Sequence, residues 1–165
     1  MNILDDKDIK QKITRLAYQI LEEYIEEKKI YVFGINNNGN RLKDQLIDTI
    51  TKISPSFNIE SHEIRLNPAD PIGTEIKTNI DIQKLNNKNV LIIDDVASTG
   101  RTLYYASSYF QSIIPKSIKV GVLVDRKHKS FPIHVDFVGR SLATTVNENI
   151  LVFIENNDEW KATIN

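Results

Sequence analysis

Hydrophobic positions in the first fifty residues follow a helical pattern, then a strand pattern, then a helical pattern again. Apolar side chains recur every three or four positions from residue 9 to residue 24, after three aspartates, which predicts an amphipathic helix that begins near Asp5. Residues 30–33 are consecutive apolar residues, which is typical of a strand buried on both faces. Residues 41–50 return to helical spacing, so residues 34–39 are expected to form a loop between strand and helix.

The remainder of the chain alternates in the same way. We expect further strands at residues 58–66, 90–93, 118–124, 135–138 and 150–154. A helix is expected from Thr102 to about residue 113, and residues 67–79, which contain two prolines and a glycine, are expected to form an exposed loop. Strands that alternate with helices indicate an α/β fold with a mostly parallel central sheet flanked by helices.

Composition limits the classes of protein to which this chain can belong. A length of 165 residues with 41% hydrophobic content supports one sizeable core, and no linker-like segment divides it, so we expect a single domain over residues 1–165. The absence of cysteine excludes disulfides and cysteine-based metal or nucleophile chemistry. The first thirty residues are charged throughout, and no apolar run approaches the roughly 20 residues of a membrane helix, so we expect a soluble, cytoplasmic protein with no membrane partner.

Residues 90–103 combine a buried strand with two carboxylates and a run of small residues. Asp94 and Asp95 follow the strand and are therefore expected at its carboxyl end, where open α/β sheets bind ligands. The small residues after them allow backbone N–H groups to converge on an anion, and Thr102 begins a helix whose positive end faces the same point. Because carboxylates accept hydrogen bonds from hydroxyls, the pattern favours a phosphorylated sugar such as ribose 5-phosphate. The competing interpretation is an ordinary strand followed by a capped helix.

This segment resembles the 5-phosphoribosyl-1-pyrophosphate (PRPP) motif of the type I phosphoribosyltransferases, in which a hydrophobic strand and two acids precede a Thr-Gly-Arg-Thr-like loop. The resemblance implies the type I phosphoribosyltransferase fold, with a small hood over the base site. It also implies that Asp94 and Asp95 are catalytic, hold the ribose hydroxyls and place Mg²⁺ directly or through water. The residues implied to bind PRPP are Asp94, Asp95, Val96, Ala97, Ser98, Thr99, Gly100, Arg101 and Thr102.

Residues 9–21 and 120–148 narrow the resemblance to the bifunctional pyrimidine-operon attenuation regulators that are also uracil phosphoribosyltransferases. The implied reaction converts uracil and PRPP to uridine monophosphate and pyrophosphate. The resemblance therefore also implies that the protein binds uridine nucleotides. The residues implied to form the base hood are Arg126, Lys127, His128, Val138 and Gly139. The resemblance further implies a homo-oligomer, a dimer or larger. Two other functions stay open, namely a nucleotide-sensing regulator with little catalysis and a phosphoribosyltransferase for another base.

Two segments depart from the pattern of this family. The pyrophosphate loop is expected at Ile35, Asn36, Asn37, Asn38 and Gly39, where the regulators carry basic side chains. Asparagine donates hydrogen bonds without charge, which predicts weak pyrophosphate binding, and the alternative is a plain turn with left-handed asparagines. Arg41, just downstream of this loop, is the residue expected to compensate for the missing charge. In residues 63–79, which resemble the family's mobile lid, the usual arginine is replaced, and Lys77 is the residue expected to substitute for it.

A basic cluster at residues 126–129 raises the hypothesis that the protein binds a messenger RNA leader, as the regulators of this family do. The candidate RNA contacts are Thr14, Arg15, Lys129 and Arg140. Contacts to phosphates need a basic face, whereas the formal net charge of the chain is −1. A solvated charged loop is therefore the favoured interpretation of the cluster.

Overall fold

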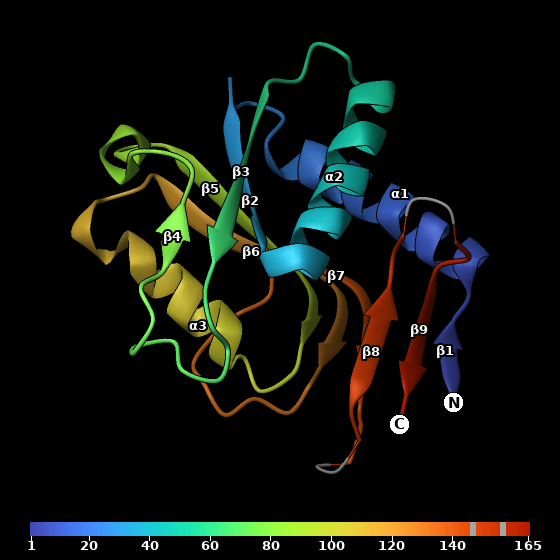
Figure 1. Ribbon diagram of the computed structural model, residues 1–165. Helices are drawn as coiled ribbons and strands as arrows, with labels where there is room; N and C mark the ends of the chain where they lie inside the picture. Colours follow the sequence, from blue (N-terminus) through green and yellow to red (C-terminus); the bar gives the residue numbers. More distant parts are fainter. Residues whose placement is uncertain (146–147, 156–157) are drawn as a thin grey trace.

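The computed structural model describes residues 1–145, 148–155 and 158–165 (Figure 1). Its central sheet has six strands in the order β4-β3-β2-β5-β6-β7. These strands are β2 (Ile30–Ile35), β3 (Ile59–Arg65), β4 (Lys77–Thr78), β5 (Asn89–Ala97), β6 (Ser117–Arg126) and β7 (Phe137–Leu142). Neighbouring strands pair in parallel except β3 and β4, which are antiparallel. The predicted mostly parallel sheet is confirmed, and its parallel strands end at one edge.

Helices cover both faces of this sheet. α1 (Asp6–Glu23) and α2 (Asn36–Ile53) pack on one face, and α3 (Arg101–Ser108) packs on the other with two short 3-10 helices, η1 (Ile82–Leu85) and η2 (Tyr109–Ser112) (Figure 1). Along β5, Leu91 and Ile93 face the α1–α2 side, whereas Val90 and Ile92 face the α3 side. The apolar run at residues 90–93 is thus buried on both faces. None of the helices described is long and apolar enough to cross a bilayer.

A second, antiparallel sheet brings together segments that are far apart in the sequence. Its strand order is β1-β9-β8, with β1 (Asn2–Leu4), β8 (Ile150–Phe153) and β9 (Lys161–Ile164). The buried side chains of Leu4, Val152, Ile154 and Ala162 extend the hydrophobic core on the α1–α2 face. This small sheet is separate from the central sheet, and the residues predicted to form the base hood lie outside it, in β6, β7 and the loop between them (Figure 1).

Several boundaries differ from those that the sequence pattern predicts. α2 begins at Asn36, so residues 34–39 are the end of β2 and the first turn of the helix rather than a loop. Asparagine is a weak helix former, and three in a row carry no local helix signal. β5 continues to Ala97, and β7 begins at Phe137 rather than at residue 135. β1, β4 and β9 are not predicted, because strands of two to four residues are too short to show a period.

Candidate active site

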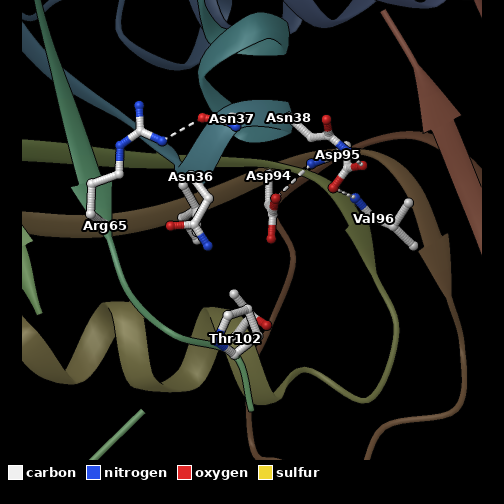
Figure 2. A pocket seen from close by; sticks show the side chains of 10 residues that line it. Asn36, Asn37, Asn38, Arg65, Asp94, Asp95, Val96 and Thr102 are labelled. Atoms are coloured by element: carbon white, nitrogen blue, oxygen red, sulfur yellow. Dashed lines mark hydrogen bonds between the residues drawn. The ribbon is translucent and has the colours of Figure 1, made fainter. Parts of the chain in front are cut away.

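A cavity of about 560 Å³ opens at the carboxyl ends of β2, β3 and β5 (Figure 2). Its lining consists of Ile35, Asn36, Asn37, Asn38, Arg65, Pro68, Asp94, Asp95, Val96 and Thr102. The acid pair of β5 and the asparagine run after β2 meet here because these two strands are neighbours in the sheet. A hydrogen bond of 2.9 Å from Asn38 Nδ2 to Asp95 Oδ2 joins the two groups directly. The cavity therefore unites two segments that the sequence marks separately.

The two carboxylates of β5 occupy different environments. Asp94 is 8% exposed, and its Oδ1 accepts a 2.9 Å hydrogen bond from the backbone N–H of Asp95. The more exposed Asp95 accepts a 2.9 Å bond from the N–H of Val96. Burial, and then the negative charge of Asp95, hold the pKa of the Asp94 carboxyl well above its ordinary value. Asp94 consequently retains a proton at pH values where an exposed aspartate is ionised, until a bound cation favours the charged form.

Two helix N-termini are directed at this acid pair. α2 starts at Asn36 and α3 starts at Arg101. The N-cap residues Ile35 and Gly100 make no side-chain capping hydrogen bond, and the N–H of Arg101 makes a long bond of 3.4 Å to Thr99 Oγ1. The first N–H groups of a helix have no partner within the helix and carry a partial positive charge, so both starts are suited to bind phosphate oxygens. Gly100 precedes α3 with φ +85°, a conformation that L-residues with side chains rarely adopt.

The asparagine run is held by protein partners on every side chain. Asn36 has φ +50°, and its amide pairs with both backbone groups of Leu66: Nδ2 donates to the carbonyl at 3.0 Å, and Oδ1 accepts from the N–H at 3.1 Å. Asn37 Oδ1 accepts a 2.6 Å hydrogen bond from Arg65, and Asn38 donates to Asp95. The left-handed conformation of Asn36 agrees with the alternative interpretation of this segment as an asparagine turn. The turn nevertheless lines the cavity.

A buried lysine supports this turn from behind. Lys43 is 5% exposed, and its Nζ donates to Asn40 Oδ1 at 2.8 Å and to the carbonyl of His62 at 3.0 Å. Asn40 Nδ2 in turn donates to the carbonyl of Asn36 at 2.6 Å. The first turn of α2 is thereby joined to the neighbouring strand β3.

Replacing Lys43 with methionine is expected to lower the free energy of unfolding by about 2–3 kcal/mol, because two buried acceptors lose their donor while the volume is kept. Urea denaturation measures the change. Lys52→Met on the same helix is the control, since the Lys52 side chain is 75% exposed, and it is expected to change stability by less than about 0.5 kcal/mol. Equal stability of the two variants would contradict this role for Lys43.

The loop between β5 and α3 is bound to two other loops. Ser98 Oγ accepts a 2.9 Å hydrogen bond from Arg126, and the carbonyl of Thr99 accepts from the N–H groups of Ser130 and Phe131 at 2.9 and 3.1 Å. Arg101 donates to the carbonyl of Ala69, at 3.3 Å, in the predicted lid. Of the predicted PRPP residues, Asp94, Asp95, Val96 and Thr102 line the cavity, whereas Ala97, Ser98, Thr99, Gly100 and Arg101 form the connection between them.

The residues predicted for the base hood are not among those that line the cavity. Arg126 is 8% exposed and donates to Ser98, to Thr144 Oγ1 at 2.6 Å and to the carbonyl of Thr145 at 2.8 Å. Lys127 and His128 are exposed in the loop after β6. Val138 and Gly139 lie in β7, where a Cβ on Gly139 would be 2.5 Å from the carbonyl oxygen of Leu123. Arg126 therefore connects the loop between β5 and α3 to the segment that leads to β8.

The four candidate RNA contacts lie on three separate elements. Thr14 and Arg15 are exposed on α1. Lys129, in the loop after β6, forms an ion pair with Asp125 and donates to the carbonyl of Arg126. Arg140 of β7 donates to the carbonyl of Ile3 at 2.8 Å. Thr14 Oγ1 also donates to the carbonyl of Lys10 at 3.0 Å, so three of the four side chains are already bound to protein groups.

Sequence reasoning missed two lining residues, Arg65 and Pro68. Neither of the cations expected to compensate lines the cavity. Arg41, expected to compensate for the neutral loop, has its NH1 3.8 Å from Glu155 Oε1, and Lys77, expected to substitute for the lid arginine, lies in β4. Arg65 is the last residue of β3, at the same sheet edge as the acid pair. The signal in the sequence that points to Arg65 is its position near the end of the strand predicted at residues 58–66.

Comparison with known families decides the class of protein. The family described as "Phosphoribosyl transferase domain" matches residues 1–154. The chain belongs to the phosphoribosyltransferase family. It is similar to the "Bifunctional protein PyrR" of Staphylococcus epidermidis, with 36% identity over 174 residues, 98% of this chain and 96% of the relative. The PyrR of Macrococcus caseolyticus is 31% identical over 162 residues, 95% of this chain and 93% of the relative.

Solved phosphoribosyltransferases share the fold. A hypoxanthine phosphoribosyltransferase of Trypanosoma cruzi superposes with a TM-score of 0.76 at 16% identity, over 99% of this chain and 90% of that chain. A hypoxanthine-guanine phosphoribosyltransferase of Bacillus anthracis gives a TM-score of 0.71 at 21% identity, over 86% of this chain and 82% of that chain. These likenesses confirm the predicted type I phosphoribosyltransferase fold. Together with the PyrR relatives, they make the chain a phosphoribosyltransferase of the PyrR type.

Proposed function

We propose that this phosphoribosyltransferase transfers the phosphoribosyl group of PRPP to uracil N1, forming uridine monophosphate and pyrophosphate. The observation that carries the proposal is the cavity that the Asp94–Asp95 pair shares with the N-terminal starts of α2 and α3. Such an arrangement suits a ligand with ribose hydroxyls between two phosphate groups. Uracil is favoured as the base by the 31–36% identity to PyrR proteins over nearly the whole chain.

Each part of the cavity receives a role in this reaction. The ribose hydroxyls donate to the carboxylates of Asp94 and Asp95, and the 5-phosphate binds the N–H groups at the start of α3. The pyrophosphate lies against the start of α2. As the bond to pyrophosphate breaks, positive charge develops at the ribose C1 next to two carboxylates, which stabilises the transition state more than the ground state.

The acid pair also fits the Mg²⁺ ion that phosphoribosyltransferases generally use with PRPP. The described residues contain no group of three or more His, Cys, Asp or Glu side chains that could enclose a metal. Mg²⁺ is commonly held by one or two carboxylates and completed by substrate phosphates and water, so Asp94 and Asp95 would suffice. The ion, when bound, would neutralise part of the charge on the leaving pyrophosphate.

Incubation with PRPP, Mg²⁺ and each of four bases tests the proposal. We expect uridine monophosphate from uracil and little product from hypoxanthine, guanine or orotate, as measured by chromatography of the nucleotides. The Asn-rich turn without basic side chains predicts a high KM for PRPP. Nucleotide from another base in place of uracil would refute the substrate assignment. No product despite measurable PRPP binding would favour a ligand sensor.

RNA binding is a second candidate function, favoured by the bifunctional relatives. A gel shift with a pyrimidine-operon leader RNA tests it, with a shuffled RNA of equal length as the control. A specific complex should weaken as salt rises, because phosphate contacts release counterions. No salt-sensitive complex at micromolar protein would reject this function.

A further inference from the structure

We propose that Arg65 binds the pyrophosphate group of PRPP and supplies the positive charge that the asparagine turn lacks. The proposal rests on the function proposed above and identifies a residue for one part of it. Its starting point is a mismatch of charge: Asn36, Asn37 and Asn38 are neutral, whereas the group expected beside them carries several negative charges.

Arg65 is placed at the cavity by the end of a strand. It is the last residue of β3, and it lines the cavity opposite the acid pair. Figure 2 shows its guanidinium turned toward the start of α2, where NH1 donates a 2.6 Å hydrogen bond to Asn37 Oδ1. The charge therefore lies beside the free N–H groups of the helix. An anion bound at the start of α2 would contact both the Arg65 guanidinium and the first N–H groups of the helix.

The Arg65 guanidinium is held in place by Glu63 and Asn37 and still has N–H donors available for a ligand. Nε and NH2 of Arg65 each lie 2.8 Å from Glu63 Oε2. The hydrogen bonds from Nε to Glu63 and from NH1 to Asn37 use two of the five N–H groups of an arginine, and NH2 makes an ion-pair contact with Glu63, so N–H groups remain on both terminal nitrogens. Glu63 is not a lining residue of the cavity, so it holds the guanidinium from the side away from the ligand. The Arg65 side chain is 48% exposed and can be reached by an anion.

Other cations near the cavity do not line it. Lys43 is buried behind the turn, and Arg41 is paired with Glu155. Arg101 donates to the carbonyl of Ala69 and is not a lining residue. Among the residues that the structure describes, Arg65 is the cation that lines this cavity. It is also a different residue from the lid arginine whose absence the sequence indicates.

Calorimetric binding of pyrophosphate with Mg²⁺ tests the assignment without turnover. Arg65→Gln is expected to weaken pyrophosphate binding about 10- to 100-fold, because charge-assisted hydrogen bonds typically contribute that much to affinity. Arg65→Lys should fall between Arg65→Gln and the wild type, because it keeps the charge and loses the planar fork. Arg41→Gln is the matched control and should bind pyrophosphate as the wild type does. Ribose 5-phosphate, the second probe, should bind equally well to all four proteins.

The same measurements separate failure of this assignment from failure of the proposed function. Wild-type affinity of Arg65→Gln for pyrophosphate, in a protein that forms uridine monophosphate, would overturn the role of Arg65 alone. An equal loss of pyrophosphate and ribose 5-phosphate binding would overturn it in favour of a structural role. If the wild-type protein binds neither pyrophosphate, ribose 5-phosphate nor PRPP, the proposed function is refuted, and so is the role proposed for Arg65.

Discussion

Asp94→Asn is expected to make the protein more stable at neutral pH and to reduce phosphoribosyl transfer at least about 100-fold. The stability gain follows from burial: the Asp94 carboxyl is 8% exposed beside Asp95, and its ionisation is opposed by both. The neutral amide keeps the shape of the side chain and avoids this cost, so we expect a gain of about 1 kcal/mol. The loss of activity is expected because, in the proposed reaction, the amide removes a negative charge next to the cation that develops at the ribose C1.

The gain in stability should depend on pH in a defined direction. The raised pKa of Asp94 means that the folded protein keeps a proton which the unfolded chain releases near the ordinary pKa of 3.8. Below this value the carboxyl is protonated in both states, and the variant gains nothing from charge. As pH rises above it, the wild type loses stability until the folded-state pKa is passed. The advantage of Asp94→Asn is therefore small near pH 4 and largest at neutral pH.

Thermal unfolding of both proteins across this pH range, beside the turnover assay, checks the expectation. Asp48→Asn is the control, since the Asp48 side chain is 61% exposed and pairs with Lys52 on the surface of α2. It should change neither activity nor the pH profile of stability by a measurable amount. If Asp94→Asn is less stable than the wild type at pH 7, the prediction is wrong. The surroundings of Asp94 would then fully offset the cost of ionising its buried carboxyl.

Gly39→Ala is expected to disable the site although alanine is the better helix former. A Cβ at this position would lie 2.7 Å from the carbonyl oxygen of Ile93 and 3.3 Å from Asp94 Oδ1. Because the nearer atom belongs to the backbone, the start of α2 must move away from β5. A shift of about 1 Å at a catalytic site can cost roughly 100-fold in rate. Overpacking of this kind typically costs about 1–3 kcal/mol of stability.

Helix propensity alone predicts the opposite sign, a gain of about 0.5–1 kcal/mol on replacing a helical glycine with alanine. The sign of the change in urea denaturation therefore distinguishes the two explanations. Thr51→Ala, at an exposed position of the same helix, is the control and should be neutral or slightly stabilising. If Gly39→Ala is active and more stable than the wild type, the prediction is wrong. The start of α2 could then move away from β5 without a cost in free energy.

The sequence predicts those features that depend on neighbouring residues. The apolar run at 90–93 fixes the central strand, and the acids after it are found at the cavity because strand direction determines which edge they reach. The start of α2 is not predicted, since Asn36 is held by Leu66, thirty positions away. Arg65 was overlooked for the same reason: its nearness to Asn37 is a property of adjacent strands.

The antiparallel sheet of β1, β9 and β8 sets an order of events during protein synthesis. β1 pairs with β9, and Asn2 lies opposite Thr163, so β1 has no partner strand until the ribosome has made residues 161–164. The strands of the central sheet are complete by Leu142, and their pairing does not require the later segment. Pairing across such a long stretch of chain is slow. The central sheet and its cavity can therefore fold on the nascent chain before the small sheet completes the hydrophobic core that it shares with α1.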